Sequence, residues 1–206
     1  MKLNHLNLTA TDITAKTHLV RSMPKPYLIV VTGRPGSGKT TFSRELGNEI
    51  FMPIISRDQI KEGYVHTFGK RHHELPEDVN ITATAIFFET LSGLITNHVS
   101  VIAEAAFQHK IWSSMLEQFM EKAQVYMLIC KVDEKVALDR FVRRGLNNPL
   151  REYFHGDKEV DMARKGIELT VSTYEEPRIN VPTFHVNTSG IYTPSIKELS
   201  SIFFDN

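Results

Sequence analysis

Short apolar runs alternate with longer stretches of helical spacing along most of the chain. Tyr27–Val31 is a continuous apolar run, rich in β-branched residues, that is closely followed by Gly33. Such a run is typical of a strand buried on both faces of a parallel sheet. Four comparable runs are found at Pro53–Ser56, Val99–Ala103, Val125–Val132 and, more weakly, Thr183–Asn187. The pattern therefore predicts five strands.

Between these runs the apolar residues recur every three or four positions, as on one face of a helix. The stripe within Ile111–Met120 is the clearest, and its Trp112 is expected to lie in the core. Pro76–Asp78 suits the first turn of a helix to about Asn97, because proline and acidic residues favour helix N-termini. Three more helices are expected over residues 41–50, 160–174 and 196–203. This alternation predicts right-handed crossovers and a parallel sheet between two helix layers.

Two segments fall outside the alternation. Residues 1–26 form an N-terminal extension in which Thr11 or Asp12 would cap a short helix. Residues 145–157 are polar and contain glycine and proline, which is typical of a mobile loop or lid. The predicted organisation is thus an extension followed by one domain over 27–206 that carries this lid.

The composition supports a single globular domain. The 206 residues are 41% hydrophobic and 23% charged, which excludes collagen-like, coiled-coil and wholly disordered chains. Basic and acidic residues both number 24, so no global field would recruit nucleic acid or an anionic membrane. The single cysteine, Cys130, lies in an apolar run and is expected to be a buried thiol in a reducing compartment. Without a secretory signal or a run of ~20 apolar residues, a cytoplasmic protein is expected.

One motif carries most of the candidate chemistry. The segment G-R-P-G-S-G-K-T at residues 33–40 fits the phosphate-loop pattern G-x-x-x-x-G-K-[ST] without a mismatch. Its glycines let backbone N–H groups surround an anion, Lys39 would reach the β- and γ-phosphates, and the Thr40 hydroxyl would bind Mg²⁺. The alternative is a plain glycine-rich turn, but an apolar strand precedes the motif and a helical segment follows it. The residues expected to contact the nucleotide are Gly33, Arg34, Pro35, Gly36, Ser37, Gly38, Lys39, Thr40 and Thr41.

A GTPase switch is excluded, because the chain contains neither a D-x-x-G element nor an N-K-x-D guanine-binding motif. Two carboxylates instead follow predicted strands, at the edge where ligands gather in parallel α/β folds. Asp58 could accept the proton of an attacking hydroxyl and hold that oxygen in line with the γ-phosphate; a helix N-cap is its alternative role. Glu104 could bind Mg²⁺ through water or contact the substrate, or it could be a plain surface carboxylate.

Arg140 and Arg144 are four residues apart on a predicted helix and share a face beside the lid. Arginines on a closing lid can neutralise charge on a transferred phosphoryl group. The alternative is a solvated basic face whose arginines pair with Asp139 or Glu134.

These elements, in this order, resemble P-loop kinases of the group with the 5′-kinase domain of phage polynucleotide kinase, chloramphenicol phosphotransferase and zeta-toxin-like kinases. The resemblance covers about residues 27–145 and rests on G-R-P-G-S-G-K-T-T-F-S-R-E-L, S-R-D-x-x-K, V-I-A-E and R-F-V-R-R-G. It implies a three-layer α/β/α P-loop NTPase fold with strand order 2-3-1-4-5. It also implies that Asp58 is catalytic and that Arg140 and Arg144 act on the phosphoryl group. Lys61 stands where this group usually has an arginine.

The expected function is ATP- and Mg²⁺-dependent phosphorylation of a hydroxyl on a small-molecule or nucleotide-like acceptor. The expected catalytic residues are Lys39, Asp58, Arg140 and Arg144; Asp58, Lys61 and Glu104 would contact the acceptor, and Thr40 and Glu104 the metal. A polynucleotide 5′-hydroxyl kinase is one alternative, although balanced charge favours a nucleic-acid partner less. A non-catalytic, ATP-gated binding module is another, and it would not need the carboxylate at position 58. The sequence identifies neither the acceptor nor the oligomeric state.

Overall fold

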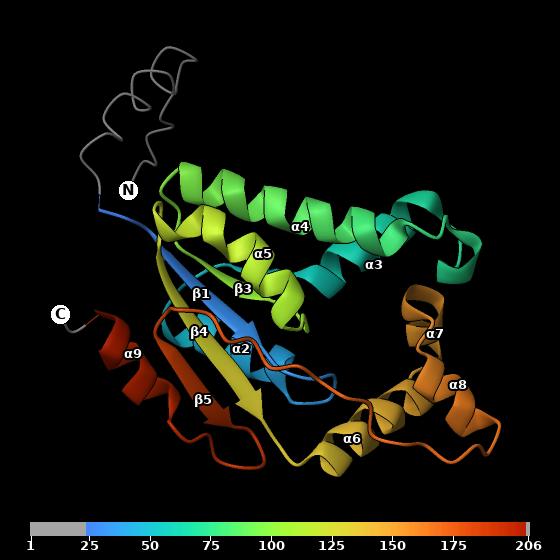
Figure 1. Cartoon of the computed structure of the whole chain (residues 1–206). Helices are drawn as coiled ribbons and strands as arrows, with labels where there is room; N and C mark the ends of the chain where they lie inside the picture. Colours follow the sequence, from blue (N-terminus) through green and yellow to red (C-terminus); the bar gives the residue numbers. More distant parts are fainter. Residues whose placement is uncertain (1–23, 205–206) are drawn as a thin grey trace, which may run out of the picture.

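The fold is seen in a computed structural model that describes residues 24–204; the helix expected near Thr11 lies outside this range. Its centre is a five-stranded sheet in the order β2-β3-β1-β4-β5 (Figure 1). All four strand pairs are parallel. The strands are β1 (Tyr27–Thr32), β2 (Ile54–Ser56), β3 (Val101–Glu104), β4 (Gln124–Lys131) and β5 (Thr183–Asn187). The predicted fold class, strand order and five strands are confirmed.

Helices cover both faces of the sheet (Figure 1). One layer contains α4 and α5, and the other contains α2 and α9. Phe87 and Trp112 anchor the core on the first face, Phe42 and Phe203 anchor it on the second, and all four are fully buried. These helices are α2 (Lys39–Glu49), α4 (Val79–Thr96), α5 (His109–Met120) and α9 (Ile196–Phe204).

By length and composition alone, α4 is apolar enough to cross a membrane. Its Phe87, Leu91 and Ile95 are nevertheless buried in the core between the sheet and α5. This is the position of a core helix, and the apolar character of α4 is explained by the sheet that it covers.

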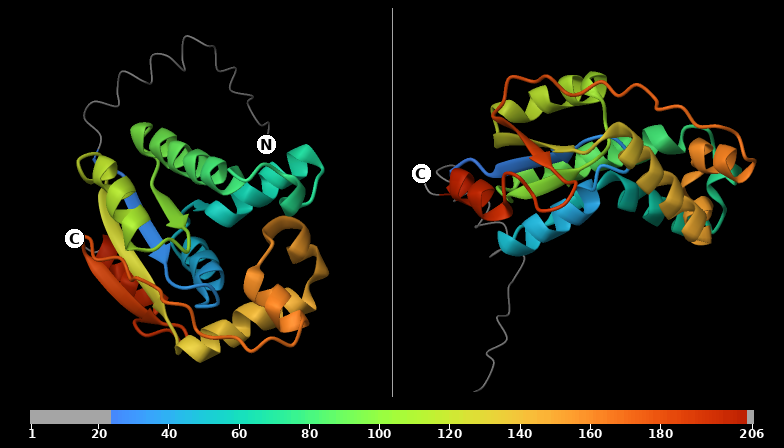
Figure 2. Two further views of the ribbon diagram at one scale, coloured as in Figure 1. Left: turned by 45° about the vertical axis from the view of Figure 1, so that its right-hand side comes forward. Right: turned by 90° about the horizontal axis from the view of Figure 1, so that it is seen from below.

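The remaining helices surround the carboxyl ends of the strands, where ligands bind in this kind of fold. α3 follows β2, while α6 follows β4 and carries α7 and α8 at its far end (Figure 2). α7 contacts α3, where Lys61 of α3 donates to the His155 carbonyl of α7. The bounds are α3 (Arg57–Phe68), the 3-10 turn η2 (His72–Glu74), α6 (Glu134–Asn147), α7 (Pro149–His155) and α8 (Lys158–Arg164).

The prediction of an irregular loop over 145–157 is wrong. The segment completes α6 and forms α7, because the Asn148 side chain accepts a hydrogen bond from the Leu150 N–H and caps the new helix. Gly156, with a φ of 61°, then ends α7 in the left-handed conformation. The lid is therefore a helical arm made of α7 and α8.

The helix predicted over 160–174 is confirmed only for its first turn, in α8, and is wrong beyond Arg164. α8 ends early, with Gly166 at a φ of 69°, and residues 165–182 cross the molecule without helix or strand (Figure 2). We call residues 165–182 the strap. Several of its polar backbone groups bind other elements; the Glu175 N–H, for example, donates to the Gln108 side chain at 3.0 Å. These tertiary hydrogen bonds override the apolar spacing that favoured a helix.

The lid is tightly packed on α6, and one glycine pair tests this. A Cβ on Gly145 of α6 would collide with the Val160 side chain of α8, whereas a Cβ on Gly93 of α4 would meet no atom within 4 Å. We expect Gly145→Ala to lower the free energy of unfolding by about 1–3 kcal/mol through overpacking. Gly93→Ala, the matched control, should raise it by up to about 1 kcal/mol. Urea unfolding measures both, and equal effects of the two changes would contradict this packing.

Candidate active site

The phosphate loop joins β1 to α2 and is shaped before any ligand binds. Gly36 and Gly38 have φ angles of 79° and 84°, which favour glycine, and a Cβ on Gly36 would collide with the Ala137 backbone of α6. The Thr188 hydroxyl donates to the Ser37 carbonyl at 2.6 Å and ties the loop to the end of β5. The Ser37 hydroxyl itself is buried and has no hydrogen-bond partner. A curled loop of backbone amides with an unsatisfied buried hydroxyl fits a phosphate group.

Lys39, the first residue of α2, points its amine into this loop. The side chain is 7% exposed, and Nζ donates to the Arg34 carbonyl at 3.3 Å. Burial lowers the pKa of Lys39 below its ordinary value, although the nearby carboxylates of Glu104 and Asp58 act to raise it. An anion placed beside this amine would be strongly favoured.

A cavity of about 540 Å³ opens next to the loop; we call it the main cavity. It is bordered by α2, α3, β3 and the lid helices. Arg34, Gly33 and Ser37 do not line it, so their predicted nucleotide contacts would be made from within the loop. The predicted residues that do line it include Lys39, Thr40, Asp58, Lys61, Glu104, Arg140 and Arg144.

Asp58 is the second residue of α3, and the N-cap of this helix is Ser56. The N-cap alternative for Asp58 is therefore wrong. Its side chain is 54% exposed, and the residue lines the main cavity. Burial acts to raise the pKa of Asp58, but the positive charges of His155, Arg57 and Lys39 outweigh it and bring the pKa below its ordinary value. The carboxylate is therefore ionised at neutral pH and can accept a hydrogen bond from an alcohol.

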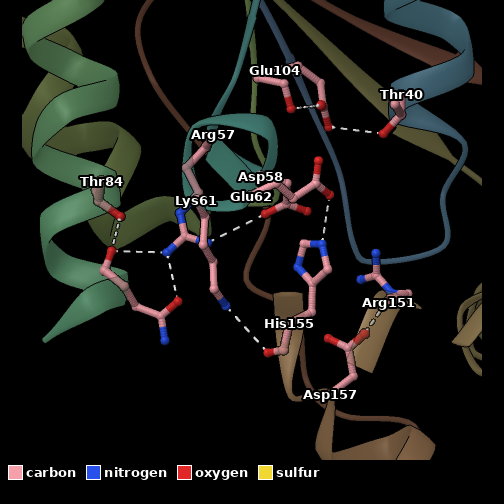
Figure 3. Close-up of polar contacts among 12 residues, drawn as sticks. Thr40, Arg57, Asp58, Lys61, Glu62, Thr84, Glu104, Arg151, His155 and Asp157 are labelled. Carbon is pink, nitrogen blue, oxygen red and sulfur yellow. Dashed lines mark hydrogen bonds and ion pairs between the residues drawn. The ribbon is translucent and has the colours of Figure 1, made fainter. Parts of the chain in front are cut away.

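Glu104 lies at the end of β3 and is 4% exposed, so a surface carboxylate is the wrong description. The Ser56 hydroxyl donates to its Oε2 at 2.6 Å, and the Thr40 hydroxyl lies 3.5 Å from its Oε1 (Figure 3). Over residues 24–204, no group of three or more His, Cys, Asp or Glu side chains is arranged to hold a metal. Mg²⁺ in nucleotide sites needs no such group, because it binds one hydroxyl or carboxylate together with phosphates and water. The donors Thr40 and Glu104 fit that role.

Arg140 and Arg144 both line the main cavity from α6. The Arg140 guanidinium donates to the carbonyls of Thr188 and Ser189 at 3.2 and 3.4 Å, so it is tied to the loop after β5. Arg144 lies over the Phe141 ring, with 5.8 Å between guanidinium and ring centroid. Arg144 is thus the more available of the two for a phosphoryl group.

The alternative pairing of these arginines with acidic neighbours is not what the structure shows. Asp139 pairs with Arg143 at 2.6 Å, and Glu134 pairs with Arg34 of the phosphate loop. In the described part of the chain, neither arginine at the cavity forms an ion pair.

The lid adds two residues that the sequence interpretation did not assign. His155 Nε2 lies 2.8 Å from Glu62 Oε1, and the His155 carbonyl accepts from Lys61 Nζ at 3.3 Å (Figure 3). Arg151, one turn earlier on α7, donates to Asp157 at 2.7 Å and also lines the main cavity. The sequence signal that could have identified them is the Asn-Pro pair at residues 148–149, because this pair favours the start of a helix. On such a helix, Arg151 and His155 are four residues apart and share a face.

Lys61 is buried between α3 and α7, with 4% of its surface exposed. Burial and the adjacent Arg57 guanidinium lower the pKa of Lys61 to about 8. In residues 24–204 its amine has one hydrogen-bond partner, the His155 carbonyl, and no ion pair. The amine therefore keeps donors for a polar group in the main cavity.

Together, the strand order, the phosphate loop and the carboxylates at the strand ends define a P-loop NTPase domain, a class that binds nucleotides. A family model described as an AAA domain matches residues 28–169, and the chain belongs to that family. No curated protein sequence is significantly similar to the chain.

Several solved kinase structures share the fold. A candidate kinase from Chloroflexus aurantiacus has a TM-score of 0.69 at 20% identity, over 88% of this chain and 98% of the other. A sugar kinase from Janibacter sp. has a TM-score of 0.54 at 15% identity, over 88% and 95% of the two chains. A gluconokinase from Sinorhizobium meliloti has a TM-score of 0.51 at 17% identity, over 89% and 99%. At these identities the similarity concerns the fold alone.

The charge of His155 should be measurable at Asp58. We expect His155→Gln to raise the pKa of Asp58, because it removes the foremost of the positive charges that hold this pKa down. Carboxyl NMR titration of the variant and the wild type measures the shift. His98→Gln is the control, because His98 precedes β3 at the opposite edge of the sheet. An unchanged Asp58 pKa in His155→Gln would show that the lid does not act on this carboxylate.

Proposed function

We propose that the protein is an ATP-dependent kinase that transfers the γ-phosphoryl group to a hydroxyl of a small-molecule or nucleotide-like acceptor, with Mg²⁺. The observation that carries the proposal is the presence of Lys39 and Asp58 on the wall of one cavity. A buried amine and an ionised carboxylate can bracket a γ-phosphoryl group and an attacking alcohol. The names of the sugar kinase and gluconokinase among the structural neighbours agree with an alcohol acceptor.

The chemistry follows from positions in the main cavity. Loop amides and Lys39 hold the β- and γ-phosphates, and Mg²⁺, bound beside Thr40, would neutralise charge on the phosphate oxygens. The acceptor oxygen attacks the γ-phosphorus, the bridging bond to the β-phosphate breaks, and the hydroxyl proton passes to Asp58. Arg144 stabilises negative charge on the transferred group. The products are ADP and a phosphate monoester.

Lys61 would orient the acceptor. It lies three residues after Asp58 on α3, so the two side chains emerge from the same helix face. Because its amine has no carboxylate partner, a polar or anionic group on the acceptor would complete its hydrogen bonds. The reacting hydroxyl and this group would then be held by consecutive turns of one helix.

The role of Asp58 is tested with γ-labelled ATP, Mg²⁺ and pools of nucleosides, sugars, antibiotics and oligonucleotides. We expect the wild type to label a pool, and Asp58→Asn to lower that transfer by about 10²–10⁴-fold through loss of the proton acceptor. ATP affinity should stay unchanged. Asp139→Asn, on the solvent side of α6, is the control and should transfer label normally. Label that leaves ATP only for water in every pool would instead favour the binding-module alternative.

The role of Lys61 gives a pH dependence. Its amine loses its proton as the pH rises through about 8, so the acceptor KM should rise above that pH. Lys61→Arg keeps the charge and should remove this rise. The measurement is the acceptor KM on both sides of pH 8, with the ATP KM as internal control. A KM that is flat through this range in the wild type would make Lys61 a purely structural link to the lid.

A further inference from the structure

Beyond Phe141 the main cavity adjoins a smaller one, which we call the side cavity. Its volume is about 170 Å³. Four residues line both cavities: Pro35 of the phosphate loop, Ala106 after β3, Phe141 of α6 and Glu159 of α8. The two cavities are therefore adjacent along this shared lining, which is where a molecule bound in the first would extend into the second.

The outer wall of the side cavity is the strap, and the strap is held in place. The Tyr174 hydroxyl donates to the Phe107 carbonyl at 3.3 Å, and the Glu175 N–H donates to the Gln108 side chain at 3.0 Å. The Glu175 carbonyl in turn accepts from the His109 N–H at 3.1 Å. A long segment without helix or strand is uncommon in a compact domain unless it serves a site. These bonds give the cavity a wall that exists before a ligand arrives.

The lining suits one ring. Phe141 and Tyr174 contribute aromatic rings, and Leu138 and Val171 contribute aliphatic side chains. A protein cavity of ~150 Å³ holds one benzene molecule, so a volume of about 170 Å³ has room for a single six-membered ring. The rest of a ligand would have to lie in the main cavity.

The charges of the two cavities differ. The main cavity is lined by six lysine and arginine residues and four carboxylates, which suits phosphates. The side cavity has one cation, Arg34, and its guanidinium is already bound to Glu134. Its second carboxylate, Glu159, has no ion-pair partner within residues 24–204. The side cavity therefore disfavours another anion and favours groups that donate hydrogen bonds.

We propose that the side cavity binds the ring of the acceptor and selects a ring that carries an amino group. This inference rests on the proposed function: the reacting hydroxyl lies beside Asp58 while the ring packs against Phe141 and Tyr174. The carboxylate of Glu159 accepts the amino hydrogens. Two kinds of alcohol have this chemistry, namely nucleosides with an exocyclic amino group and amino sugars.

Calorimetry on the full chain, saturated with a non-hydrolysable ATP analogue and Mg²⁺, tests the inference with two matched pairs of probes. Cytidine is compared with uridine, and glucosamine with glucose, because an oxygen replaces the amino group in the second member of each pair: a carbonyl oxygen, with a protonated N3, in uridine and a hydroxyl in glucose. We expect the amino member of one pair to bind at least about tenfold more tightly than its partner, which is ~1.4 kcal/mol. The pair that responds tells a nucleoside from an amino sugar.

Val171→Phe should fill the side cavity and weaken that binding at least about tenfold, while the affinity for the ATP analogue stays the same. Thr173→Phe fills it from a second position on the strap, two residues further along, and guards against a folding defect of the first variant. Ile202→Phe on the exposed side of α9 adds a similar ring elsewhere and should change nothing.

Three results would overturn the inference: no preference for either amino probe, unchanged probe affinity in both filled variants, or weaker binding of the ATP analogue in them. The last result would show that the side cavity binds part of ATP and not the acceptor. These results are distinguishable from failure of the proposed function, because the calorimetry measures probe binding without phosphoryl transfer. Binding that Val171→Phe abolishes, with no phosphorylated product, would reject the kinase and keep the side cavity.

Discussion

The candidate active site depends on one buried positive charge, that of Lys39. Placing an amine in the interior is costly unless charges or hydrogen bonds compensate, and here burial does lower the pKa of Lys39. Glu104 at the end of β3 and Asp58 at the start of α3 compensate in part. The phosphate loop, which α6 and Thr188 hold in shape, provides the space where a phosphate would complete the compensation. Nucleotide affinity and the position of the carboxylates thus have a common physical origin.

The lid extends this arrangement to the acceptor side. His155 contacts α3 twice, through its ring to Glu62 and through its carbonyl to Lys61, and its charge also acts on Asp58. Docking of α7 on α3 therefore changes the environment of the carboxylate that would receive the proton. A lid that opens would expose the cavity to water and remove this influence in one movement.

The sequence was sufficient for elements whose signal is local. Buried parallel strands are continuous apolar runs, and the phosphate loop needs glycines at fixed spacing, so the sheet and Lys39 could be predicted. Asp58 followed because it comes directly after a strand. A lid was predicted near residues 145–157, but its helical form was not, because α7 depends on a cap at Asn148 and on packing of Gly145 against α8. The helix prediction was wrong in the strap, where the local spacing favours a helix but the backbone forms hydrogen bonds with the start of α5 instead.

The central claim is that one phosphoryl group can lie between Lys39 and Asp58. A crystal structure with ADP, Mg²⁺, an acceptor alcohol and a planar fluoride analogue of the transferred group tests it most directly. The account requires the analogue beside Lys39 Nζ, with the Asp58 carboxylate within ~2.6–3.2 Å of the acceptor oxygen. An analogue bound at Lys39 while Asp58 contacts only protein groups, or while the alcohol lies elsewhere, would contradict it.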